Sequence, residues 1–112
     1  MIEKVLLDYM TEAMGDIPVF MEVPEDRPDT FVVLEKTGSG KTNHLCSATF
    51  ALQSYAPSMY EAAALNEEVK TAMENAITLD DVTRSALNSD YNFTDTASKG
   101  YRYQAVFDVI HY

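Results

Sequence analysis

The chain has 112 residues, 46% of them apolar, and a formal net charge of −10. This length fits one domain, residues 1–112, that buries about two thirds of the surface its unfolded chain exposes. The single cysteine, Cys46, excludes an intrachain disulfide and a cysteine-based zinc cluster. No apolar run reaches the length of a membrane span, and the acidic, amphipathic N-terminus does not resemble a signal peptide. The negative charge disfavours binding to nucleic-acid phosphates, so we expect no sequence-specific nucleic-acid binding.

The first part of the chain alternates helical and strand patterns. Apolar residues over Ile2–Ala13 recur at helical spacing, and Gly15 follows as a natural stop. Residues 17–23 form a short β-favouring run that begins near a proline, which suggests an edge strand. Residues 24–30 have the composition of a turn. Residues 31–36 then predict a second strand.

A glycine-rich segment, Gly38-Ser39-Gly40, comes next, and we expect it to form the mobile tip of a hairpin. The third strand is predicted at residues 43–56, where apolar and polar residues alternate. Its apolar face includes Cys46, so this thiol is expected to be buried.

The second half predicts one helix and two more strands. Residues 57–76 form the clearest helical pattern, with Ser58 and Glu61 at the spacing of a capping box. From residue 82 the pattern returns to a strand that kinks near residues 89–90. Residues 94–100 form a polar connector, and residues 101–112 alternate as a final strand. The order α-β-β-β-α-β-β predicts an α+β fold: a mostly antiparallel sheet of four to five strands with two helices on one face.

The string "TGSGKT" at residues 37–42 resembles the end of a phosphate-binding loop. That loop needs a glycine at position 35, where this chain has Glu35, and it must open a helix. Here it opens a pattern of period two instead. A nucleotide site is therefore not expected.

The sequence gives equally little support for a metal site, a cysteine nucleophile or a catalytic carboxylate pair. His44 and Cys46 share a strand face, but no third or fourth metal ligand follows at a suitable spacing. A nucleophile formed by Cys46 and a histidine is conceivable, although a structural thiol is favoured. The pair at residues 80–81 is typical of a solvated turn. We predict no catalytic residues, no cofactor and no metal, and hence no enzyme.

Three strings together carry a resemblance: "VPEDRPDTFVVLEKTG", "QSYAPSMYEAAALNEEV" and "SDYNFTDTASKGYRYQAVFDVIHY". In this order they resemble the small tail-terminator or tail-completion proteins of long-tailed bacteriophages and prophages. The resemblance runs from Pro18 to Tyr112, and its motifs are structural. It implies an antiparallel sheet with helices on one face, and a hexameric ring that caps the tail tube. It also implies contacts with the major tail tube protein and a head-connector protein, and a place in the tail or neck of a virion assembled in the bacterial cytoplasm.

Basic residues in an acidic ring subunit are candidates for subunit contacts. Lys36 and Lys41 flank the expected hairpin tip, which contains Gly38 and Gly40, and we expect the lysines to meet an acidic surface on a neighbouring protein. Arg102 is the second candidate because arginine is enriched at interface hot spots. The alternatives are a different phage neck component (a head-closure or connector subunit), an acidic inhibitor that mimics nucleic acid, and an enzyme with a dispersed site.

Overall fold

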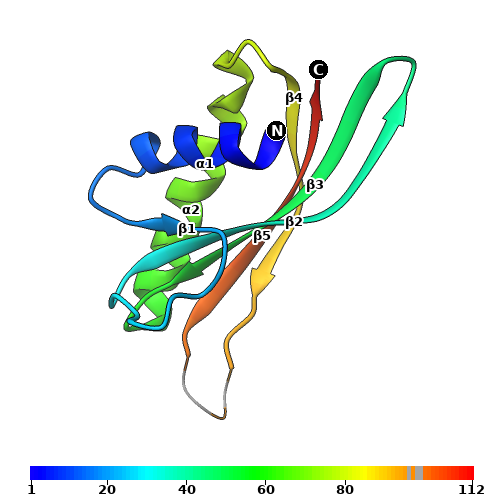
Figure 1. The fold of residues 1–112 in the computed structure, drawn as a ribbon. Helices are drawn as coiled ribbons and strands as arrows, with labels where there is room; N and C mark the ends of the chain where they lie inside the picture. The colour runs from blue at the N-terminus through cyan, green and yellow to red at the C-terminus, as the bar shows by residue number, and fades with distance from the viewer. Residues whose placement is uncertain (96, 98–99) are drawn as a thin grey trace.

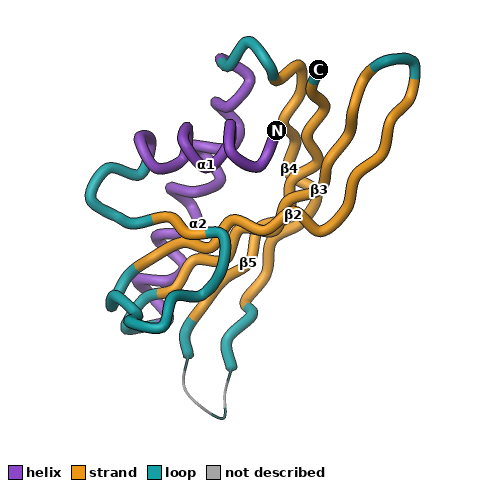
Figure 2. Tube along the Cα trace, viewed as in Figure 1, coloured by secondary structure: helices purple, strands orange, loops and turns teal. Residues whose placement is uncertain are grey.

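The computed structural model describes residues 1–95, 97 and 100–112. The predicted α+β fold and element order are confirmed. Two helices cover one face of a five-stranded, mostly antiparallel sheet (Figure 1). Figure 2 shows the helices gathered on one side while the β2–β3 hairpin projects past them.

The elements follow one another in the order α1 (Ile2–Ala13), β1 (Val19–Phe20), β2 (Phe31–Thr42), β3 (Leu45–Tyr55), α2 (Met59–Glu74), the 3₁₀ turn η1 (Asn75–Thr78), β4 (Val82–Asn92) and β5 (Arg102–His111). The strand order in the sheet is β1-β2-β3-β5-β4. Among the described residues, β1 and β2 are the only strands that pair in parallel. The expected connector at residues 94–100 includes positions 96, 98 and 99, which lie outside the described residues.

The end of α1 and the start of α2 are as the sequence predicts. Gly15 follows α1 with a φ of 62°, a conformation that glycine adopts without the strain of a side chain. The Ser58 Oγ accepts a hydrogen bond of 3.2 Å from the Glu61 backbone N–H at the start of α2. It also donates to the Glu61 carboxylate at 2.9 Å, so both residues of the capping box are engaged.

The main core lies between the helices and the sheet. Its largest side chains with no exposure include Phe50 of β3 and Phe107 of β5, which face each other across the two strands. The apolar stripes of α1 and α2 cover them. The fully enclosed helical residues are Leu6, Met10, Ala62, Val69 and Met73.

A second, smaller cluster lies on the opposite face of the sheet. Phe31, Val33 and Tyr55 are buried there, and Phe20 packs against them. The rings of Phe31 and Tyr55 stack with centroids 4.4 Å apart. The start of β2 is therefore buried on both faces, which explains why its first four residues read as a continuous apolar run.

The expected position of the hairpin tip is wrong. Gly38, Ser39 and Gly40 lie inside β2, paired with β3, and the turn is formed by Asn43 and His44. These two residues have φ values of 52° and 68°, as a two-residue type I′ turn requires. A Cβ on Gly40 would lie 3.1 Å from the Ser47 Oγ, so this glycine permits close approach within the strand pair.

Two strands differ from expectation in length or regularity. β1 is restricted to Val19–Phe20, although residues 17–23 favour a strand, because only Val19 and Phe20 pair with β2. The kink expected near residues 89–90 of β4 is present as a register irregularity between Leu87 and Ser89.

None of the helices in the described part of the chain is long and apolar enough to cross a membrane.

Candidate interaction surfaces

Four of the five candidate residues lie on one strand. Lys36, Gly38, Gly40 and Lys41 all belong to β2, and Lys41 is opposite Cys46 near the end of the hairpin. Arg102 begins β5 and is opposite Tyr55. Nine strand positions separate Cys46 from Tyr55, so Lys41 and Arg102 lie about 30 Å apart at opposite ends of the sheet. They form two separate surfaces.

Lys36 is not a free cation beside the hairpin tip. Its Nζ lies 3.0 Å from the Glu3 carboxylate, and both side chains are largely covered. A backbone hydrogen bond at the start of α1 and the Lys36 ammonium both lower the pKa of Glu3. Lys36 therefore joins α1 to β2, and an interface role for it would first require this ion pair to break.

Lys41 differs from Lys36 because it extends from an exposed part of the strand. All six residues from position 37 to position 42 are exposed. Among the described residues, the ion pairs of lysine involve Lys4, Lys36 and Lys70, and none involves Lys41. Lys41 is thus available for a contact outside the chain.

The outer edge of β2 is open along this segment. In the described part of the chain, β1 pairs only with Val32 and Val33 of β2. The residues beyond Val33 pair with β3 on one side only. At the other side of the sheet, β4 pairs with β5 and with no further strand in the described residues, so its outer edge is open there as well. The sheet therefore ends in two strands that can accept a further strand.

Arg102 takes part in a cluster of aromatic side chains on the sheet face away from the helices. Its guanidinium lies 4.4 Å from the ring centroid of Phe93 and 5.6 Å from that of Tyr55. It donates hydrogen bonds of 2.7 Å to the Phe93 carbonyl and to the Tyr55 hydroxyl. The Arg27 guanidinium lies over the same Tyr55 ring at 5.9 Å.

This cluster spans the full width of the sheet. Phe20 contacts Phe31 edge to face, and Tyr91 contacts Phe93 in the same way. Arg102 joins the two aromatic pairs through Tyr55. Sequence reasoning singled out Arg102 but missed Arg27 and Tyr55, because cation–π contacts between distant positions have no local sequence signal. Tyr91 and Phe93 are 42% and 40% exposed, so part of this cluster remains open to a partner.

The same sheet face carries a polar network towards its middle. The Gln53 Nε2 donates to the Gln104 Oε1 at 2.9 Å, and the Gln104 side chain in turn donates to the Tyr91 hydroxyl. Asp108 accepts hydrogen bonds from Thr49 and Asn88. The face between the aromatic cluster and the hairpin is therefore polar, and its side chains already bond to one another.

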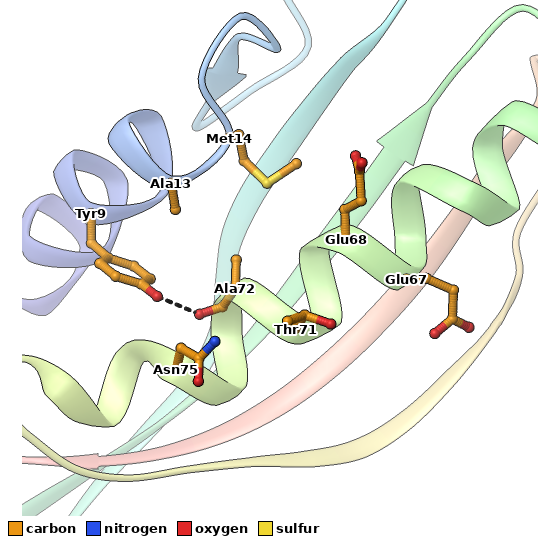
Figure 3. A pocket seen from close by; sticks show the side chains of 8 residues that line it. All are labelled: Tyr9, Ala13, Met14, Glu67, Glu68, Thr71, Ala72 and Asn75. Atoms are coloured by element: carbon orange, nitrogen blue, oxygen red, sulfur yellow. Dashed lines mark hydrogen bonds between the residues drawn. The ribbon is translucent and has the colours of Figure 1, made fainter.

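A shallow groove of about 550 Å³ separates the end of α1 from α2 (Figure 3). Tyr9 closes one side of it by donating a 2.6 Å hydrogen bond to the Ala72 carbonyl. Burial raises the pKa of Tyr9. Glu67 and Glu68 line the opposite side, so the groove favours a positively charged side chain over an anion.

A partly buried polar cluster attaches α2 to β4. The Lys70 Nζ lies 2.9 Å from the Asp90 carboxylate and 3.0 Å from Glu67. The hydrogen bond to Asp90 is the main cause of a raised Lys70 pKa. The amide of Asn66, only 1% exposed, also donates to Asp90 at 3.0 Å. Through its contact with Asp90, Lys70 joins α2 to the sheet.

The structure brings Cys46 and His111 together as direct cross-strand partners on β3 and β5. Both side chains are half-buried, so the thiol is not enclosed as expected. No hydrogen bond among the described residues joins them, although a base that activates a thiol needs one. His44 lies apart in the hairpin turn. No group of three or more His, Cys, Asp or Glu side chains in the described residues could hold a metal ion.

No protein-family model matches this chain, and comparison with curated proteins gives no significant match.

Proposed function

We propose that this protein is a non-enzymatic phage or prophage structural protein, a tail terminator. In this proposal, copies of the chain form a ring, with six as the expected number. The ring caps the tail tube, stops its growth and then receives the head connector. The partners are further copies of the chain, the major tail tube protein and a head-connector protein, within a virion assembled in the bacterial cytoplasm.

The observation that best supports a ring is the pair of open edges on β2 and β4. A closed ring needs two different patches on each subunit, one that meets the preceding copy and one that meets the next. Open strand edges at the two sides of one sheet meet this requirement, because each can add a strand from a neighbour.

The resemblance of the three sequence strings supplies the particular function. They lie on the elements that form the sheet and its helical cover, and the element order is the one that the resemblance implies. A net charge of −10 also suits a ring through which DNA passes, since a cationic wall would retain the phosphates.

The test is deletion of the gene from its phage or prophage, with electron microscopy of the products. We expect tail tubes of uncontrolled length and heads that carry no tails, and rescue by the wild-type gene. Intact virions after deletion would refute the proposal. Tubes of normal length that fail to join heads would indicate a neck component other than the terminator.

A further inference from the structure

We infer that the free edge of β2 in one copy pairs with the free edge of β4 in the next copy, so that the ring contains a continuous antiparallel sheet. This inference rests on the proposed ring and specifies its interface. The segments concerned are residues 38–42 of β2 and residues 84–87 of β4.

The strand directions fit this junction. β2 runs antiparallel to β3, β3 antiparallel to β5, and β5 antiparallel to β4. β2 and β4 therefore point in opposite directions. In a cyclic ring every copy has the same orientation along the axis, so β2 of one copy meets β4 of the next as an antiparallel pair.

The segments of β2 and β4 without register irregularities also lie at the same position along the strand direction. Gly38 is opposite Thr49, which is opposite Asp108, which is opposite Ala86. The same path along the sheet leads from Gly40 to Arg84. Register irregularities bound both segments, between Lys36 and Gly38 in β2 and on either side of residues 84–87 in β4. The regularly paired segments of β2 and β4 therefore coincide along the strand direction.

The backbone N–H and C=O groups of β2 that are not bonded to β3 point outwards, towards the neighbouring copy. Thr42 and Leu45 flank the two-residue turn, and such a flanking pair exchanges hydrogen bonds. Alternation along the strand then directs the groups of Gly40 and Gly38 towards β3, and those of Ser39 and Lys41 outwards. A Cβ added to Gly38 would meet nothing within 4 Å, so the sheet face is also uncovered at this point of the strand.

Charge supports the same arrangement. Lys41 is opposite Cys46, which is opposite His111, which is opposite Val82. Lys41 therefore lies at the same position along the strand direction as the start of β4. Asp80 and Asp81 immediately precede Val82, and both are exposed. In the inferred junction, Lys41 of one copy lies beside this acidic pair of the next copy, and the unpaired cation gains a partner.

A proline substitution tests the backbone contact. Ser39→Pro removes one outward N–H and leaves the bonds to β3, and the preceding residue is a glycine, which tolerates a following proline. Ser39→Ala is the matched control, because it removes the same side chain and keeps the N–H. We expect Ser39→Pro to assemble at least about tenfold more weakly than Ser39→Ala in light scattering, since an antiparallel ladder loses a hydrogen bond at its centre. Equal assembly of the two variants would overturn the inference.

Cross-linking tests the register without relying on the proline. Gly38→Cys combined with Ala86→Cys, in a Cys46→Ser background, should give a covalent ladder up to the closed ring after oxidation. Each single variant should stay uncross-linked. If the wild-type protein forms rings but the double cysteine variant gives no ladder, the edge pairing is overturned and the proposed function stays intact. Dimers from Gly38→Cys alone would show that two β2 edges pair with each other. If wild-type protein forms no ring, either alone or on tail tubes, both proposals fail.

A charge exchange tests the side-chain contact. Lys41→Asp, or Asp80→Lys with Asp81→Lys, should weaken assembly by about fivefold for each lost pair, and the combined variant should restore it. Additive loss in the combined variant would contradict the placement of Lys41 beside residues 80–81.

Discussion

The two halves of β2 are paired with β3 in the same way and yet have opposite surroundings. Phe31, Val32, Val33 and Leu34 are at most 2% exposed, while the six residues from position 37 onwards are all exposed. The first half is covered by the main core on one face and by the aromatic cluster on the other. The second half has only its hydrogen-bonded partner strand. The first half of β2 therefore contributes to the core, and the second half is available for contacts with another copy.

This contrast predicts where substitutions reduce stability and where they reduce assembly. Replacements around the covered half should unfold the protein, because they remove buried contacts. Replacements in the exposed half should leave the monomer stable and change only its association.

The largest expected effect comes from the core. Phe50→Ala should lower the free energy of unfolding by about 3–5 kcal/mol, because it leaves a cavity between β3, β5 and α2. Thr42→Ala, in the exposed half of β2, should change it by less than about 0.5 kcal/mol. Urea denaturation monitored by circular dichroism measures both. Similar losses for the two variants would show that the halves do not differ in stability.

Substitutions in the aromatic cluster on the other face of the sheet should cause the second largest loss of stability. Tyr55→Ala removes a ring that stacks on Phe31 and contacts two guanidinium groups, and should cost about 3 kcal/mol. Tyr55→Phe keeps the ring and removes only the hydroxyl bonded to Arg102, for about 1 kcal/mol. The same unfolding experiment compares them. Equal losses would show that the hydroxyl, rather than the ring, holds this face together.

The cap of α2 should have a smaller effect. Ser58→Ala removes the acceptor of the Glu61 N–H and should cost about 1 kcal/mol. Ser47→Ala, an exposed serine in the hairpin, is the control and should be close to neutral. Thermal unfolding would detect the difference, and an unchanged midpoint for Ser58→Ala would mean that the cap does not support the helical layer.

The smallest effect should come from the ion pair that marks the boundary between the two halves. Glu3 has a lowered pKa in the folded protein, so its contribution is present above its ordinary value of 4.5 and is lost as the pH falls through the lowered value. Glu3→Gln removes this contribution. The variant should therefore lose less stability than wild type between pH 7 and pH 3 in parallel urea titrations. An identical pH dependence would show that the Lys36 contact does not stabilise the fold.

Some features of this protein follow from its sequence alone because they depend on near neighbours. The start and stop of α1, the capping box at Ser58, the alternation in β3 and β5 and the order of elements are all correctly predicted. Each is set by residues within a few positions of one another, through capping hydrogen bonds or the burial of one face. The α+β class follows from that order.

Other features were decided only by the tertiary structure. The glycines at positions 38 and 40 suggested a turn, but pairing with β3 extended β2 to Thr42 and moved the turn to Asn43 and His44. Pairing also placed Arg102 against Tyr55. Lys36 found its partner on α1, whereas Lys41 on the same strand remained available. Local sequence could not separate these two lysines, because the distinction depends on which element, far away in the chain, packs over each position.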